Sequence, residues 1–139
     1  MRHTTPDLIK VVGMSASGKS TLVQRLRELG YDARPVSQEH SHVPSLWQQF
    51  DPPHVLIHLD VSLAQQCARR PDVTWSAGAW QDEHARLAHA RDHAGLKVDT
   101  SAMTPEQVAA VALHFLRHRR VRRAGGPLPP VARTGSAQV

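Results

Sequence analysis

An eight-residue segment rich in glycine and serine, residues 13–20, constrains this chain more than any other feature. Its sequence, Gly-Met-Ser-Ala-Ser-Gly-Lys-Ser, matches the pattern Gly-x-x-x-x-Gly-Lys-Ser/Thr in full. The segment follows the branched apolar run at residues 8–12 and precedes residues 19–29, whose apolar positions have helical spacing. The sequence therefore predicts a buried strand, a turn of small residues and a helix, in this order.

Each part of this segment has a physical reason to bind phosphate. Small residues let the backbone wrap an anion with successive N–H groups pointing inward, and Gly13 and Gly18 permit dihedral angles that a side chain would block. The positive end of the helix dipole points at the same place. Lys19 adds a cation for the β- and γ-phosphates, and Ser20 offers a hydroxyl to a magnesium ion. We therefore expect ATP and Mg²⁺ to bind here, in contact with Gly13, Met14, Ser15, Ala16, Ser17, Gly18, Lys19, Ser20 and Thr21.

Further strands and helices alternate along the chain. Strands are expected at residues 33–37, 54–60 and 96–99. Helices are expected at residues 63–70 and 80–94 and from Thr104 onward, where Thr-Pro-Glu-Gln is a capping box with proline at the first helical position. Gly30 stands where the first helix should end. The alternation predicts an α/β fold, a three-layer sandwich with a mostly parallel sheet of about four strands and helices on both faces.

The charge of the chain is unevenly distributed. The net charge is +5, yet the segment from Arg117 onward contains several arginines and no acidic residue. We expect residues 1–120 to form one nucleotide-binding domain and residues 121–139 to be a basic and then Pro/Gly-rich disordered tail. Arginines without interleaved aromatic residues favour only non-specific attraction to nucleic acid.

Other features exclude some classes of protein. No apolar run approaches the roughly 20 residues that a membrane span needs, and the first residues lack the apolar core of a signal peptide. Cys67 is the only cysteine, which rules out an internal disulfide, and we expect it to be a small packing residue in a helix. These features favour a cytoplasmic protein without membrane contact.

With these motifs in place, the chain resembles the P-loop kinases of the nucleoside-monophosphate and small-molecule kinase group. Four features carry the likeness: the loop with Thr21 and Leu22 after it, strand 55–60 with a helix leading to Arg69 and Arg70, a lid candidate with Arg86 and Arg91, and residues 96–101 leading to the capping box. The likeness extends over residues 8–116, and the loop is its most specific part. It implies an enzyme that transfers the γ-phosphate of ATP to a nucleotide or another small-molecule acceptor.

The chain departs from this group between its second and third expected strands. Such kinases usually carry an additional strand and a larger acceptor-binding insert there, whereas this chain has only residues 38–53, expected to form a loop and a short helix. The acceptor therefore cannot be named by analogy. An ATP-dependent regulatory or switch module with slow or no hydrolysis is the alternative. A GTP switch would need an Asn-Lys-x-Asp motif, which the sequence lacks.

The candidate catalytic residues are Lys19, Glu39, Arg69 and Arg70, and the candidate metal ligands are Ser20 and Asp60. In kinases of this group, lid arginines close over the phosphates, which implies this role for Arg69 and Arg70. Asp60 ends an apolar strand, a pattern typical of an acid that associates with magnesium; the alternative is that it caps the next helix. Glu39 follows the second strand, where the resemblance implies a base or a metal neighbour; the alternative is a solvated loop acid.

Overall fold

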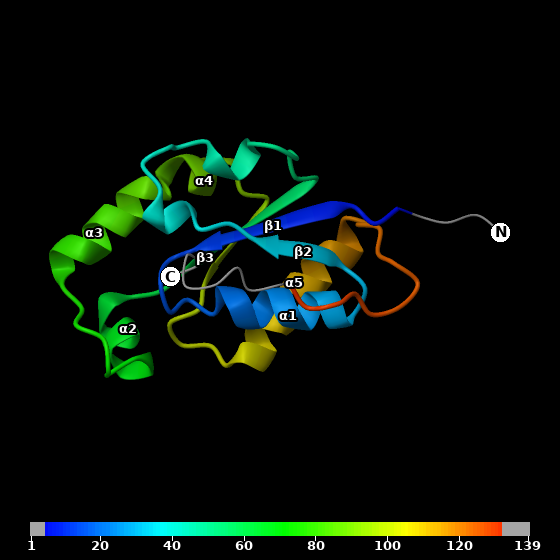
Figure 1. Cartoon of the computed structure of the whole chain (residues 1–139). Coiled ribbons are helices and arrows are strands. Elements are labelled where there is room, and N and C mark those ends of the chain that lie inside the picture. Colours follow the sequence, from blue (N-terminus) through cyan, green and yellow to red (C-terminus); the bar gives the residue numbers. More distant parts are fainter. Residues whose placement is uncertain (1–4, 132–139) are drawn as a thin grey trace.

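Four parallel strands form the centre of the computed structural model, which describes residues 5–131 (Figure 1). The strands are β1 (Leu8–Gly13), β2 (Asp32–Pro35), β3 (Val55–Asp60) and β4 (Leu96–Asp99). Their order in the sheet is β2-β1-β3-β4, and every neighbouring pair is parallel. The predicted α/β class and the four-stranded parallel sheet are confirmed.

Helices cover both faces of this sheet. The first face carries α1 (Lys19–Glu28) and α5 (Pro105–His118). The opposite face carries α4 (Ala88–His93) and the short 3₁₀ turns η1 (Gln38–His40) and η2 (Leu46–Gln48). The remaining helices, α2 (Leu63–Arg69) and α3 (Ala77–Arg86), lie beyond the carboxyl ends of the strands (Figure 1). The helices on both faces agree with the predicted layers.

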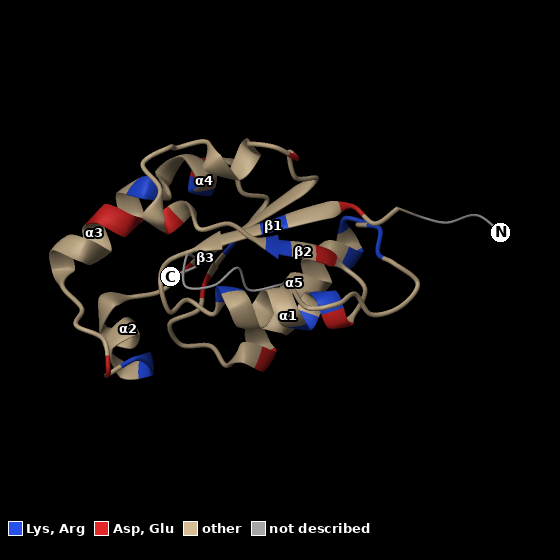
Figure 2. Cartoon of the chain, in the orientation of Figure 1, with Lys and Arg blue, Asp and Glu red and all other residues tan. Residues whose placement is uncertain are grey.

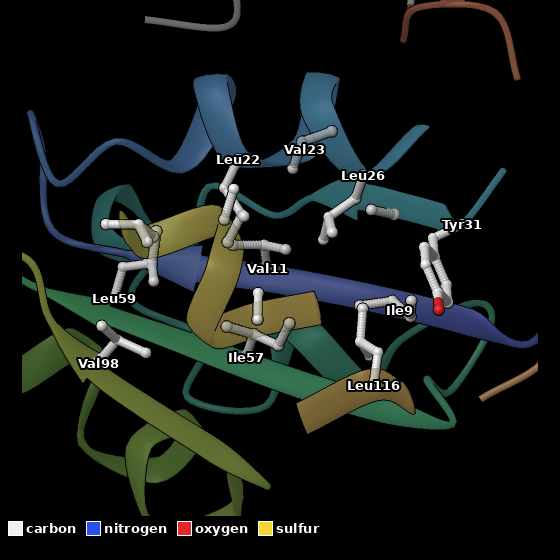
Figure 3. Packing of buried hydrophobic residues seen from close by; sticks show 14 of the residues in the cluster. Ile9, Val11, Leu22, Val23, Leu26, Tyr31, Ile57, Leu59, Val98 and Leu116 are labelled. Atoms are coloured by element: carbon white, nitrogen blue, oxygen red, sulfur yellow. The ribbon is translucent and has the colours of Figure 1, made fainter. Parts of the chain in front are cut away.

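Two hydrophobic clusters hold the layers together. The larger cluster lies between the sheet and the helices α1 and α5, and Figure 3 shows its side chains, including Ile9, Val11, Leu22, Leu26, Ile57, Leu59 and Leu116. The smaller cluster lies on the opposite face and includes Val12, Met14, Trp47, Leu56, Val61, Leu87 and Ala90. Strands β1 and β3 contribute to both clusters because successive side chains of a strand point to opposite faces. Among residues 5–131, none of the helices has the length and apolar character needed to cross a membrane.

Local sequence signals set several helix ends. Thr104 Oγ1 accepts a hydrogen bond from Gln107 N at 3.1 Å, and Gln107 Oε1 accepts one from Thr104 N at 2.9 Å, which confirms the capping box. The single helix predicted at residues 80–94 is wrong, because α3 ends at Arg86 and α4 begins at Ala88. The buried side chain of Leu87 lies at the break and belongs to the smaller cluster. Tertiary packing therefore overrides a composition that favours one helix.

The predicted disordered tail is wrong for residues 121–131. Val121 is buried in the larger cluster. Asp7 accepts hydrogen bonds from Arg122 N at 2.7 Å and from Arg122 Nη2 at 2.8 Å, and this side-chain hydrogen bond lowers the pKa of the Asp7 carboxyl. The composition of this segment alone predicts disorder, but its contacts with Asp7 and with the larger cluster hold it in place. Residues 132–139, the rest of the predicted tail, lie outside the described residues.

The end of α1 gives the same segment a second attachment. Gly30 has a φ of 91° and its N–H donates to Arg27 O at 3.0 Å, as expected for a residue that closes a helix. The Gly30 carbonyl accepts a hydrogen bond from Ala124 N at 2.8 Å.

The single cysteine, Cys67 on α2, is exposed, so its predicted packing role is wrong.

The buried side chain of His58 makes folding stability depend on pH. His58 lies in β3, is 1% exposed, and its Nε2 has no hydrogen-bond partner among the described residues. Burial lowers the pKa of His58 from 6.5 to about 4, because the charged ring would lose its hydration. The unfolded chain therefore takes up this proton at a higher pH than the folded chain. The free energy of unfolding should fall as the pH drops from about 6.5 to 4, by about 3 kcal/mol from this group.

Urea unfolding at pH 7 and pH 4 measures this effect, with His58→Leu as the matched variant. The variant removes the ionisable ring and places an apolar side chain in the same buried position. It should lose about 3 kcal/mol less stability between the two pH values than the wild type. The Asp7 carboxyl, whose lowered pKa also favours the folded state at higher pH, contributes equally to both proteins. Equal losses in the two proteins would show that His58 is not the group responsible.

Candidate functional site

The loop that joins β1 to α1, residues 13–20, lies at the carboxyl end of a central strand. Met14 N donates to Leu59 O at 3.2 Å, which ties the loop to β3. Ala16 and Gly18 have φ values of 64° and 96°, so both adopt the left-handed conformation. Alternating right- and left-handed residues turn successive N–H groups toward one side and create an anion-binding concavity. The structure therefore places a turn of small residues between β1 and α1, in the predicted order.

Close packing under the loop fixes its path. A Cβ atom at Gly13 would lie 2.6 Å from Ser17 Oγ and 2.8 Å from Leu59 O. Ser17 is 1% exposed, and its carbonyl accepts a hydrogen bond from Thr100 Oγ1 at 2.8 Å. Because these neighbours are buried or belong to the backbone, the structure has room only for glycine at residue 13.

Lys19, the first residue of α1, is held by an acidic partner. Its Nζ lies 2.7 Å and 2.8 Å from the two carboxylate oxygens of Glu39 and donates to Val36 O at 3.2 Å. The Glu39 side chain is 6% exposed. The alternative that Glu39 is a solvated loop acid is therefore wrong. The structure brings these two predicted site residues together, with Glu39 supplied by the turn η1 that follows β2.

Arg69, the last residue of α2, contacts the loop. Its Nη1 donates to Ala16 O at 2.8 Å and to Thr100 Oγ1 at 3.1 Å, and its Nη2 donates to Thr100 O at 2.5 Å. The guanidinium thus joins the loop to the segment that follows β4. Arg70, in contrast, is exposed and forms a bidentate pair with Asp72, which raises the pKa of the arginine. The structure places Arg69 at the loop and leaves Arg70 outside it.

Asp60 and Ser20, the two predicted metal ligands, lie on different elements of the fold. Asp60 ends β3 and its Oδ1 accepts a hydrogen bond from the neighbouring Val61 N at 2.9 Å. Ser62 Oγ accepts from Gln65 N at 3.1 Å, so Ser62 caps α2 and Asp60 does not. Ser20 is exposed in the first turn of α1. Both predicted ligands therefore remain near the carboxyl end of the sheet, on β3 and at the start of α1.

Two residues that the sequence did not single out also hold the loop. Glu83, on α3, accepts hydrogen bonds from Ser15 N at 3.0 Å and from Ser15 Oγ at 2.5 Å. Gln66, buried on α2, donates from Nε2 to Ser15 O at 2.8 Å. Figure 2 shows acidic positions on α3 and on the turn beside it, at the same end of the molecule. No motif or spacing relates these helices to residue 15, because their placement depends on the tertiary fold.

A cavity of about 330 Å³ opens beside the loop, between the start of α1, the end of α2 and the start of α5. It is lined by Ala16, Ser17, Gly18, Thr21, Leu22, Arg69, Thr100, Met103, Pro105 and Val108. Apolar side chains from α1 and α5 form one part of the wall, and hydroxyl groups with the Arg69 guanidinium form the other. Its size lies within the roughly 300–1,000 Å³ typical of small-molecule sites.

Comparison with known proteins does not assign this chain to a family. No protein-family model matches this chain, and no curated protein sequence matches it significantly. The functional interpretation therefore depends on the motif and on the geometry of the site.

Proposed function

We propose that this protein binds ATP with Mg²⁺ through the loop at residues 13–20 and transfers the γ-phosphate to a nucleotide or another small metabolite. One observation carries the proposal. The left-handed residues Ala16 and Gly18 line the cavity at the start of α1, and Lys19 follows them as the first residue of this helix. Inward-facing N–H groups, a helix N-terminus and a cation together favour a polyphosphate.

The lining of the cavity predicts how a bound nucleotide would be oriented, with its base in the cavity and its phosphates along the loop. The cavity walls at Leu22, Met103 and Val108 are apolar, which suits the faces of a nucleobase. Lys19 and Glu39 are not among its lining residues. A nucleotide with its base in the cavity would therefore run its phosphates along the loop toward Lys19, with the terminal phosphate at the Lys19–Glu39 end.

The proposed chemistry assigns a role to the predicted catalytic and metal-binding residues, with the exception of the exposed Arg70. Lys19 would offset the negative charge that develops on the transferred phosphoryl group. Bound Mg²⁺ would neutralise the phosphate oxygens, and Ser20 and Asp60 are the residues that would hold it or its water ligands. Glu39, once separated from Lys19, could accept a proton from the acceptor hydroxyl. Arg69 acts as a positioning residue, because its hydrogen bonds fix the loop and not a phosphate.

Acceptor-dependent formation of ADP tests this function. Mg-ATP would be incubated with the protein and with pools of nucleotides and phosphorylatable metabolites, and ADP release would be compared with the rate without acceptor. We expect at least one pool to accelerate ADP release in the wild type and none to do so in Lys19→Ala. If no pool raises the rate above the acceptor-free value, the phosphotransferase proposal is wrong. The proposal that the protein binds ATP would not be affected by this result.

One feature favours the alternative of a regulatory or switch module. The short segment 38–53 is held by hydrogen bonds within itself and to β1. Buried Gln38 accepts from Trp47 N at 3.0 Å and donates to Val43 O at 2.7 Å, and Lys10 Nζ of β1 donates to Trp47 O at 2.9 Å. This segment is where an acceptor-binding insert would stand in the kinases that the chain resembles. A measurable acceptor-free ATPase rate, together with a change of oligomer size on adding ATP, would support the switch.

A further inference from the structure

The protein places one of its own carboxylates on hydrogen-bond donors of the loop. Glu83 accepts from both the backbone N–H and the hydroxyl of Ser15, at 3.0 Å and 2.5 Å. Carboxylate and phosphate oxygens compete for the same N–H and O–H donors, and both form charge-assisted hydrogen bonds with them. With α3 in this position, the two donors of Ser15 are therefore already satisfied by an internal anion.

The helix that carries Glu83, α3, has few contacts with the rest of the protein. None of the α3 side chains is fully buried. Trp80 packs against the smaller cluster and donates from Nε1 to Val61 O at 2.9 Å, and Arg86 Nη1 donates to Glu39 O at 3.3 Å. The residues between α2 and α3 are mostly exposed. A helix with few buried contacts can leave its position at a lower free-energy cost than a core helix.

We propose that Glu83 determines whether the site accepts a nucleoside diphosphate or a triphosphate, an inference that rests on the proposed function. The cavity touches Ala16 and Gly18, whereas Ser15, Lys19 and the two carboxylates of Glu39 and Glu83 lie outside its lining. A diphosphate that starts in the cavity ends along the loop amides. The third phosphate of a triphosphate continues toward the Lys19–Glu39 end, which α3 adjoins through the hydrogen bond from Arg86 to Glu39 O. There it meets the negative charge that Glu83, on the same helix, holds at Ser15.

The consequence is a coupling between the third phosphate and the position of α3. Like charges in a partly buried site repel each other more strongly than they do in water. A triphosphate must therefore displace Glu83 from Ser15, and α3 moves with it, whereas a diphosphate leaves the contact in place. The free energy needed to break the two hydrogen bonds is subtracted from the binding of the triphosphate alone.

Calorimetric titration of Mg-ATP and Mg-ADP into the wild type, Glu83→Gln and Asp82→Asn tests this selectivity. Glu83→Gln keeps the size of the side chain and removes its charge, and Asp82→Asn removes an equal charge from an exposed position one residue away on α3. We expect Glu83→Gln to strengthen ATP binding about 10-fold while ADP binding changes less than about 2-fold. The ATP-to-ADP affinity ratio of Asp82→Asn should equal that of the wild type.

Hydrogen exchange of the peptide that covers residues 77–86 gives an independent readout of the helix. Mg-ATP should increase amide exchange in α3 of the wild type, and Mg-ADP should leave it unchanged. An unchanged ATP-to-ADP ratio in Glu83→Gln, or protection of α3 by both nucleotides, would overturn the inference. If the wild type still binds ATP and Lys19→Ala does not, the proposed function survives that outcome. Failure of both nucleotides to bind any of the proteins would overturn the inference and the proposed function together.

Discussion

Replacement of Lys19 by alanine is expected to weaken the binding of Mg-ATP at least about 100-fold, or by about 3 kcal/mol. The wild-type ammonium group stands at the first residue of α1, where the loop amides and the helix N-terminus also lie. Removing it takes away the cation for the terminal phosphates. It also leaves the carboxylate of Glu39, whose side chain is 6% exposed, without its partner and beside the phosphates. Titration calorimetry measures the change directly.

A matched variant separates these two causes. Glu39→Gln removes the charge that competes for Lys19, so this protein should bind Mg-ATP at least as tightly as the wild type while losing acceptor-stimulated ADP release. An unpaired Glu39 costs stability in Lys19→Ala, so urea unfolding is the control that both variants remain folded. Equal ATP affinity in the wild type and Lys19→Ala would mean that the phosphates bind elsewhere.

A methyl group at residue 13 is expected to destabilise the fold by more than about 3 kcal/mol. The added Cβ in Gly13→Ala would lie 2.6 Å from Ser17 Oγ and 2.8 Å from Leu59 O. Neither neighbour can move freely, because the Ser17 side chain is buried and the Leu59 carbonyl oxygen is part of the backbone of β3. The strand, the loop or both must shift, and the same shift would distort the amides that are proposed to bind phosphate.

Gly78→Ala is the control for this prediction. Gly78 lies in α3, and a Cβ atom there would meet nothing within 4 Å. Alanine favours a helix over glycine by about 1 kcal/mol, so this variant should be slightly more stable than the wild type. Chemical unfolding of the three proteins measures both effects. An unfolding free energy of Gly13→Ala within about 0.5 kcal/mol of the wild type would contradict the packing described under the loop.

Features that depend on neighbouring residues could be predicted from the sequence. The strand, loop and first helix follow from a motif and its flanks, and the capping box at Thr104 fixes the start of α5. Branched apolar runs alternating with helical segments were sufficient for a parallel sheet of four strands. In the candidate site, the sequence singled out Lys19 and Glu39, and the structure joins them at 2.7 Å.

Features that depend on contacts between distant residues could not be predicted in this way. Glu83 reaches Ser15 only because α3 lies beyond the carboxyl ends of the strands. Arg69 and Arg70 are adjacent in sequence, but the orientation of α2 turns one toward the loop and leaves the other in solvent. Pairing of Arg122 with Asp7 holds a segment whose composition alone indicates disorder.

Backbone amide spectra of the ¹⁵N-labelled protein, recorded during a titration with Mg-ATP, test most directly whether the loop binds the phosphates. The account predicts the largest chemical-shift changes at the amides of residues 14–20, smaller ones at residues 100–103 beside the cavity, and none of these in Lys19→Ala. The arginine-rich segment 117–123 should change little. Large changes confined to residues 117–123, with the loop amides unaffected, would contradict the account and assign the nucleotide to the basic surface instead.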